Sequence, residues 1–173
     1  MLYLLSLGLS KKDINSKALE VARKCNKIYF EAYTSVYPNS VEELERLFGK
    51  KIIKISRDGL ENNSDKIIQE SKNNDIGILT IGDCLSATTH ISLLLEAYKN
   101  NVETYIVHGV SILSAVGETG LSLYNFGKIS SLPFVNEDIM SVIENIKFNR
   151  KNNLHSLILL DLDPVNQIYV SIN

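Results

Sequence analysis

Small and polar residues follow directly after one of the most apolar runs of the chain. Residues 78–81 are apolar apart from one threonine, Asp83 comes two positions later, and Ser86 and Thr88 follow. At the start of a helix, such residues leave backbone N–H groups free to bind a polar or anionic ligand. The alternative is that Asp83 or Ser86 only caps that helix. Spacing alone leaves both interpretations open.

The first and fifth apolar runs end in the same way. The residues that follow them are Gly8, Leu9 and Ser10 after the first run, and His108, Gly109, Ser111 and Ile112 after the fifth. In an open parallel sheet, ligands bind outside the carboxyl ends of the strands, so these residues could face one ligand. Gly8 would allow a sharp turn and a close approach to a ligand, although one glycine after a strand is more often a simple turn.

Other common chemistries have no support in the sequence. His90, His108 and His155 occur without an HxH, HExxH or Cys/His pattern, so we expect no metal site. Cys25 and Cys84 are far apart and are expected to be reduced thiols. The chain contains no Walker loop, no GxGxxG and no Gly-x-Ser-x-Gly elbow. Asp161 and Asp163, just before Pro164, are interpreted as a turn.

The elements that must position these loops alternate between strand and helix. Strands are expected at residues 2–7, 27–31, 51–55, 76–81 and 103–107, and helices at residues 14–25, 39–49, 65–71 and 88–99. The second helix is the best marked, because Ser40 and Glu43 form a capping box and Gly49 ends it. This order predicts an α/β fold with a mostly parallel five-stranded sheet flanked by helices.

The pattern changes after the fifth strand, which indicates a second α/β domain. The segment 115–120 is suited to a turn and a short helix. A strand at 127–134, a helix at about 137–148, a strand at 154–160 and an apolar run at 167–172 follow. We therefore predict an N-terminal α/β domain at 1–114 and an incomplete C-terminal α/β domain at 115–173, since a sheet that ended there would have an edge and a poorly covered face.

Composition and charge point to a cytoplasmic globular protein. The 173 residues are 45% hydrophobic with a net charge of −2, which argues against direct nucleic-acid binding. Lys147, Arg150 and Lys151 are best explained as a solvated helix end. The apolar stretches are shorter than the ~20 residues that cross a bilayer, so we expect no membrane span. The chain opens on a strand-like run without a leader-like segment.

Taken together, several short segments resemble the diphthine synthase family, within the tetrapyrrole-methylase-like class of S-adenosylmethionine enzymes. They lie in the same order along the whole chain, and the Glu-Ala-Tyr-Thr-Ser segment is the most specific of them. The segments are 1–4 through 8–10, 31–35, 82–83 with 87–90, 108–112, 114–117, 123–128, and 154–155 with 159–161.

The resemblance implies a fold, a cofactor and a substrate. It implies a two-domain homodimer that binds S-adenosyl-L-methionine in the cleft between its domains and releases S-adenosyl-L-homocysteine. The family reaction methylates the amino group of the 3-amino-3-carboxypropyl chain on a histidine of translation elongation factor 2, in diphthamide biosynthesis. The cofactor contacts of the family fall here on Leu9, Asp83, Ser86, Ser111, Ile112 and Leu160. No catalytic base is implied; His90 and His108 are candidates, and packing or hydrogen bonding is the simpler role for each.

The sequence departs from the family pattern in ways that affect these expectations. Ser6 stands where the family usually has glycine, which would crowd the backbone, and Cys84 replaces the proline of a Gly-Asp-Pro turn, which would loosen that loop. Ser86 replaces an apolar residue. Because the family continues well beyond residue 173, the chain alone is expected to bind the cofactor weakly or not at all. The alternatives are a non-catalytic dimeric remnant and a corrin- or porphyrin-precursor methylase of the same fold.

Overall fold

The computed structural model describes residues 1–134, 139–163, 166 and 168–170. The chain divides into two compact units, Met1–Leu113 and Ser114–Asn173, and each is described by itself.

The first unit is built on a parallel sheet of five strands. They are β1 (Leu2–Ser6), β2 (Lys27–Glu31), β3 (Ile52–Ile55), β4 (Ile76–Thr80) and β5 (Thr104–Val107). Their order across the sheet is β3-β2-β4-β1-β5, and every neighbouring pair is parallel. All five residues of the central strand β4 are buried, as expected for a strand covered on both faces. The predicted fold class is confirmed.

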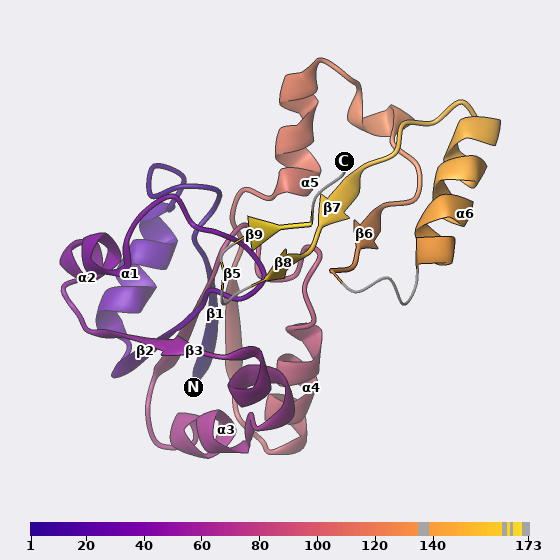
Figure 1. Ribbon diagram of the computed structural model, residues 1–173. Helices are drawn as coiled ribbons and strands as arrows, with labels where there is room; N and C mark the ends of the chain where they lie inside the picture. The colour runs from indigo at the N-terminus through magenta and orange to yellow at the C-terminus, as the bar shows by residue number, and fades with distance from the viewer. Residues whose placement is uncertain (135–138, 164–165, 167, 171–173) are drawn as a thin grey trace. The chain divides into compact units, whose positions relative to one another are not determined.

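Helices cover both faces of this sheet (Figure 1). The helices α1 (Ser16–Lys24) and α2 (Val41–Phe48) pack on one face, where Val21 and Phe48 join a buried cluster. The helices α3 (Asp65–Ser71) and α4 (Ile91–Lys99) pack on the other face, together with a π-helical turn at Asp58–Asn62. The capping box of α2 is present as predicted, and Gly49 ends the helix with φ +68°.

The chain leaves two neighbouring strands of the sheet toward opposite faces. β1 and β4 lie side by side, but the chain leaves β1 through α1 on one face and leaves β4 through α4 on the other. The loops after these two strands therefore diverge at the carboxyl edge of the sheet. Such a switch point is where open α/β sheets bind their ligands.

The second unit contains short elements. They are α5 (Ile112–Ala115), which begins at the end of the first unit, 3-10 turns at Val116–Thr119 and Leu123–Asn125, β6 (Ser130–Leu132), α6 (Ile139–Lys151), β7 (Ile158–Leu160), β8 (Leu162–Asp163) and β9 (Ile168–Tyr169). β6 and β7 pair in parallel, and β8 pairs with β9 in antiparallel orientation. Part of the predicted 167–172 run and the predicted start of α6 lie outside the described residues.

Both predicted strands that flank α6 are interrupted near their starts. The N–H of His155 donates to the carbonyl of Asn125 in an isolated parallel bridge between Phe126 and His155, and the paired strands β6 and β7 begin only at Ser130 and Ile158. Asn149 is fully buried, and its amide bonds both the N–H and the carbonyl of Lys128 at 2.8 Å. A side chain at Gly127 would lie 2.1 Å from Oδ1 of Asn149, so glycine is required there.

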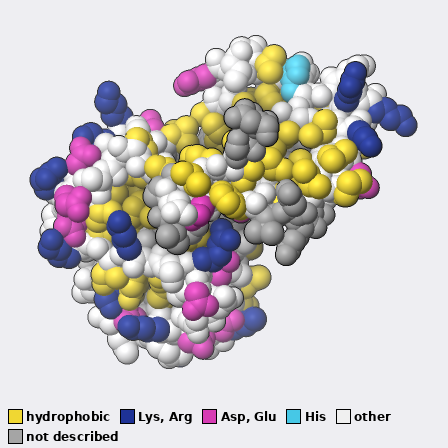
Figure 2. All heavy atoms as spheres, viewed as in Figure 1, with side chains coloured by type: hydrophobic (Ala, Val, Ile, Leu, Met, Phe, Trp, Pro, Cys, Tyr) yellow, Lys and Arg dark blue, Asp and Glu magenta, His cyan; other side chains and the backbone are white. Residues whose placement is uncertain are grey.

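Hydrophobic side chains remain at the surface of the second unit, as Figure 2 shows. Phe134, Met140 and Phe148 are among the exposed ones. None of the helices in the described part of the chain is long and apolar enough to span a bilayer.

Candidate functional site

Two glycines join the loops that follow β1 and β4. The N–H of Gly8 donates to the carbonyl of Gly82 at 3.1 Å, and the N–H of Gly82 donates to that of Gly8 at 2.9 Å. Both residues have positive φ, +69° and +75°, which glycine adopts without strain. The two loops are therefore linked by a short two-bond bridge before they diverge.

The loop after β5 joins the same point through Gly109. Its N–H donates to Oδ2 of Asp83 at 3.1 Å. A Cβ atom at this position would lie 2.7 Å from Cβ of Ser6, 3.1 Å from the carbonyl oxygen of Gly82 and 3.2 Å from the nitrogen of Gly8. The three loops that contain Leu9, Asp83 and Ser111 thus meet at the carboxyl edge of the sheet, and only glycine allows their backbones to come so close.

Asp83 is the residue that holds these loops together. Its Oδ1 accepts from the N–H of Leu85 at 2.9 Å and from the hydroxyl of Ser86 at 3.2 Å. Its Oδ2 accepts from Gly109 and from Nδ1 of His108, the latter at 2.9 Å. Burial raises the pKa of Asp83, but the hydrogen bonds from Leu85, Gly109 and His108 outweigh burial and lower the pKa below its usual value. The carboxylate is therefore ionised and fully bonded within the protein.

The structure contradicts both interpretations that placed Asp83 and Ser86 at the start of a helix: they do not cap it, and the N–H groups of Cys84, Leu85 and Ser86 are already hydrogen-bonded within the protein. The helix α4 begins at Ile91 rather than at residue 88, and its N-cap position is His90. The hydroxyl of Thr88 and Nδ1 of His90 both bond to the carbonyl of Cys84, at 2.7 and 3.1 Å. These two bonds fold the segment before the helix into a tight loop, in which Ala87 has φ +58°.

Ser6 and Cys84, two of the departures from the family pattern, contact each other. The N–H of Cys84 donates to Oγ of Ser6 at 2.9 Å, and both residues are fully buried. A proline at 84 would have no N–H, and a glycine at 6 would have no hydroxyl. Hydrogen bonds to the N–H and the carbonyl of Cys84 thus hold this loop in place of a proline ring.

The other predicted cofactor residues of the first unit lie around the same edge. Leu9 and Ser86 are half-buried, and Ser111 is buried, with its Oγ accepting from the N–H of Leu113 at 3.1 Å. Ile112 exposes 42% of its surface and is available to an apolar ligand group. The structure brings these residues of the first unit together with Asp83. Leu160, at the end of β7, belongs to the second unit.

Sequence reasoning missed Asn15, and it placed Gly109 in the loop after the fifth strand without foreseeing its role. Asn15 caps α1 through its Oδ1, and its Nδ2 donates to the carbonyl of His108 at 2.7 Å. Gly109 provides the close approach described above. An asparagine directly before a helix signals the cap, but no local pattern signals a bond to a residue 93 positions away.

The histidines and cysteines do not form a metal centre. No group of three or more His, Cys, Asp or Glu residues in the described ranges is placed to hold a metal ion. Cys25 and Cys84 are buried free thiols, and burial raises the pKa of both, that of Cys25 to about 11. Neither is a thiolate nucleophile near neutral pH.

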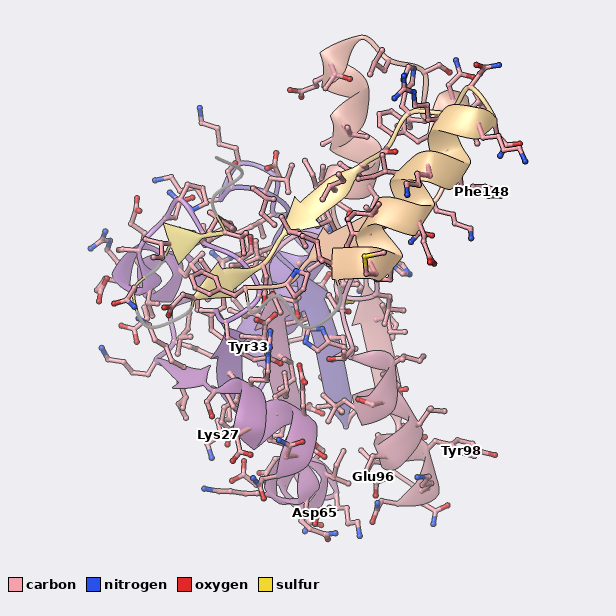
Figure 3. The ribbon with its side chains drawn as sticks, turned by 45° about the vertical axis from the view of Figure 1, so that its right-hand side comes forward. Lys27, Tyr33, Asp65, Glu96, Tyr98 and Phe148 are labelled. Carbon is pink, nitrogen blue, oxygen red and sulfur yellow. The ribbon has the colours of Figure 1, made fainter. Side chains whose placement is uncertain are left out.

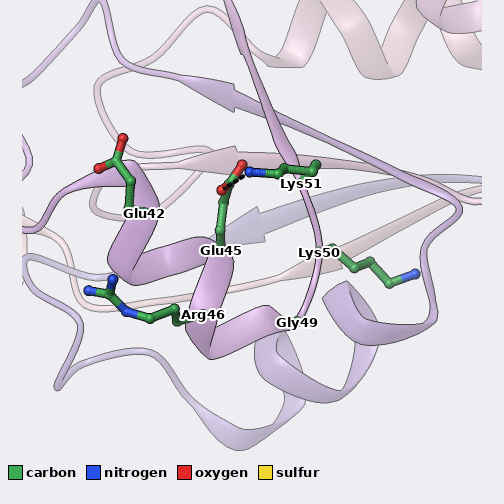
Figure 4. A pocket seen from close by; sticks show the side chains of 6 residues that line it. All are labelled: Glu42, Glu45, Arg46, Gly49, Lys50 and Lys51. Carbon is green, nitrogen blue, oxygen red and sulfur yellow. Dashed lines mark hydrogen bonds and ion pairs between the residues drawn. The ribbon is translucent and has the colours of Figure 1, made fainter.

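A surface hollow beside α2 lies away from these loops (Figure 4). It is lined by Glu42, Glu45, Arg46, Gly49, Lys50 and Lys51. Lys51 pairs with Glu45 at 2.8 Å, and the ammonium group of Lys50 bonds to the carbonyl of Cys25. Because Lys51 directly precedes β3, the hollow lies at the amino-terminal edge of the sheet, opposite the edge where the loops meet.

Comparisons with known proteins agree with this architecture. The profile of the Tetrapyrrole (Corrin/Porphyrin) Methylases matches residues 1–161. Diphthine methyl ester synthases of Schizosaccharomyces pombe and Homo sapiens are each 41% identical to this chain over 165 residues, which is 94% of this chain and 58% of theirs. The chain therefore spans less than two thirds of these relatives' own length.

Solved structures show the same similarity. A crystal structure of diphthine synthase superposes with a TM-score of 0.89 at 40% identity, covering 94% of this chain and 65% of that one. A putative diphthine synthase from Entamoeba histolytica gives a TM-score of 0.84 at 35% identity, over 98% of this chain and 66% of that one. The parallel sheet, the glycine-bridged loops at its carboxyl edge and the profile match together place this chain in the tetrapyrrole (corrin/porphyrin) methylase family.

Proposed function

We propose that the protein is an S-adenosylmethionine-dependent methyltransferase of the diphthine synthase type. Its substrate would be the amino group of the 3-amino-3-carboxypropyl chain on a histidine of elongation factor 2, in diphthamide biosynthesis. The observation that carries this proposal is the convergence of the loops of Leu9, Asp83 and Ser111 at the switch point between β1 and β4. The names of its relatives support the diphthamide pathway.

The residues at this edge suit an adenosyl cofactor. A Cβ atom at Gly82 would meet nothing closer than the carbonyl oxygen of Val110, at 4.0 Å, so there is room beside the loop. The hydroxyl of Ser86 and the backbone around Ser111 would bind the ribose and the amino-acid end. The exposed side chain of Ile112 would lie against the adenine. The bound cofactor supplies a methyl group that is already activated on its sulfonium.

The protein must then align the acceptor amine with this methyl group and remove one proton from the amine. His108 is our proposed base. Its Nδ1 donates to the ionised Asp83, so in the neutral ring Nε2 carries the lone pair, and the side chain is 69% exposed. The relatives' name includes a methyl ester, which implies transfer to a carboxylate oxygen. A carboxylate is nucleophilic without losing a proton, so that transfer would not need His108.

A homodimer is part of the proposal. On α4, Ile91, Leu95 and Tyr98 are exposed and recur at the spacing of one helix face. Tyr98 exposes 82% of its surface and points away from the first unit (Figure 3). An apolar stripe of this kind is suited to a second copy of the chain. We place the protein in the cytoplasm with its substrate, where Cys25 and Cys84 would stay reduced.

The direct test is mass spectrometry of elongation factor 2. The protein and S-adenosylmethionine are incubated with factor that carries the unmethylated 3-amino-3-carboxypropyl histidine, and a corrin precursor is the parallel substrate. The proposal predicts a gain of methyl groups on that histidine and none on the corrin precursor. Transfer to the corrin precursor alone would reassign the substrate, and transfer to neither would contradict the proposal.

A further inference from the structure

Two buried ionisable residues beside the candidate site have no role in the chemistry proposed above. Glu31 ends β2, and His90 ends the loop that contains Asp83 and Ser86. The exposed fractions of their side chains are 0% and 1%, and Nε2 of His90 lies 3.7 Å from Oε2 of Glu31. Burying two such groups is costly unless each is paired or hydrogen-bonded.

The carboxyl group of Glu31 accepts several hydrogen bonds. Its Oε1 accepts from the N–H of Tyr33 at 3.0 Å and from the N–H of Thr34 at 2.9 Å. The hydroxyl of Thr34 lies 3.0 Å from both carboxyl oxygens. Backbone N–H groups that donate to a carboxyl oxygen stabilise the carboxylate over the acid. Oε2 is left facing His90.

The hydrogen bond on the other side of the ring fixes the proton on Nδ1 of His90. Nδ1 lies 3.1 Å from the carbonyl oxygen of Cys84, and a carbonyl only accepts, so Nδ1 carries a hydrogen. Nε2 has no partner within hydrogen-bond distance among the described residues. A water about 2.8 Å from both atoms would bond them at an acute angle of roughly 80°, so a bridging water does not fit this buried gap of 3.7 Å. An unprotonated Nε2 would direct a lone pair at a carboxylate.

A proton on Nε2 removes this repulsion. We propose that His90 is an imidazolium paired with the Glu31 carboxylate, and that this buried pair positions the loop of residues 82–90. The positioning acts through Nδ1, which holds the carbonyl of Cys84, while the N–H of Cys84 is held by Ser6. That this loop binds the cofactor rests on the proposed function; the positioning itself does not.

A second contact ties the same two segments together at the surface. Oε1 of Glu61 accepts from the hydroxyl of Tyr33 at 3.1 Å and from that of Thr89 at 2.9 Å. Tyr33 is two residues from Glu31, and Thr89 directly precedes His90. The Glu-Ala-Tyr-Thr-Ser segment and the loop after β4 are therefore connected twice, by the buried pair of Glu31 and His90 and by Glu61 at the surface. Of the two connections, the buried pair is the one that bonds to Cys84.

The first test is nitrogen-15 NMR of the histidine rings of the whole chain at neutral pH. Both ring nitrogens of His90 should resonate as protonated nitrogens. In the Glu31→Gln variant, which keeps an acceptor for Tyr33 and Thr34, one nitrogen should become unprotonated while Nδ1 keeps its hydrogen. An unprotonated nitrogen on His90 in the natural chain would overturn the proposal.

The second test follows hydrogen exchange of the amides of Leu85 and Gly109, whose bonds to Asp83 report the position of the loop. Glu31→Gln and His90→Gln should each speed exchange of both amides about tenfold while the amide of Ile78 in β4 stays protected. Glu70→Gln is the matched control, because Glu70 pairs with Lys27 at the other edge of the sheet.

The two tests do not depend on cofactor binding, so they separate this inference from the proposed function. Unchanged loop exchange in Glu31→Gln would refute the positioning role. If a variant fails to fold, the ring measurement on the natural chain still decides the protonation state. His90→Asn offers a further comparison, since it retains a donor near Nδ1 but cannot reach Glu31, and its loop should exchange faster than that of the natural chain.

Discussion

At the residue scale, the structure explains why Ser6 and Cys84 occur together. The N–H of Cys84 donates to the hydroxyl of Ser6 at 2.9 Å. With glycine at position 6 this buried N–H would have no acceptor, and with proline at position 84 the buried hydroxyl would lose its donor. The side chain of Ser6, which was expected to crowd the backbone, lies against Gly109, and glycine has no side chain that could clash with it. The two positions therefore act as one unit, which neither position alone would suggest in the sequence.

A double-mutant cycle tests this coupling. Ser6→Gly should lower the free energy of unfolding by about 1–3 kcal/mol, because the N–H of Cys84 is left buried and unbonded. Cys84→Pro alone should also be destabilising. The double variant should lose less than the sum of the two by about 1 kcal/mol or more, as measured by urea unfolding. A control cycle of Ser6→Gly with Asn74→Ala, at the amino-terminal edge, should be additive; additivity in both cycles would reject the coupling.

Asp83 gives a pH-dependent prediction. Its pKa is lower in the folded protein than in the unfolded chain, so its ionised form stabilises the fold above the unfolded pKa, and this contribution is lost as pH falls through the folded pKa. Asp83→Asn should therefore cost about 1–3 kcal/mol at pH 7. The difference from the natural chain should shrink below about pH 4. A difference that is constant from pH 7 to pH 3 in denaturant titrations would contradict this.

Asp83 also shows how far residue types predict a site. The sequence identifies it because a charged residue follows an apolar strand. The sequence does not identify its partners His108 and Gly109, which are 25 and 26 positions away. Such bonds arise only when β1, β4 and β5 lie side by side, and local spacing carries no information about that order.

At the element scale, the order of strands and helices could be predicted from the sequence, but the residues at which they begin and end were less predictable. Residues 27–31 and 65–71 form elements with the expected bounds, because apolar periodicity acts locally. The start of α4 was missed by three residues, since Thr88 and His90 bond back to Cys84 instead of entering the helix. The π-helical turn at Asp58–Asn62 was also missed. The strands of the second unit are also shorter than predicted, and there the side chain of Asn149 bonds both backbone groups of Lys128.

Gly109 tests the close approach of the three loops. Gly109→Ala should place Cβ within 2.7 Å of Ser6 and 3.1 Å of the Gly82 carbonyl, so the loop after β5 must shift. We expect a loss of stability of about 1–3 kcal/mol and faster exchange of the Leu85 amide. Gly49→Ala is the control, because nothing lies within 4 Å there and only its φ of +68° is strained. Equal, small effects of both substitutions would count against the close approach.

At the scale of the whole molecule, the proposed dimer has a surface that can be altered without touching the loops. Leu95→Lys places a charge in the exposed stripe of α4 and should shift the protein from dimer to monomer in sedimentation velocity. Lys24→Ala on α1, which packs on the other face of the sheet, is the matched control and should stay dimeric. A natural chain that sediments as a monomer, or a Leu95→Lys dimer of unchanged affinity, would remove this surface from the account.

The central claim is that the loops of Leu9, Asp83 and Ser111 form one wall of an adenosyl pocket. Amide chemical shifts recorded during a titration of the chain with S-adenosyl-L-homocysteine test it most directly. We predict weak, saturable shifts confined to the amides of Leu9, Leu85, Gly109 and Ile112, with none around Lys50 in the hollow beside α2. Saturable shifts that leave those four amides unchanged and appear elsewhere in the first unit would contradict the claim.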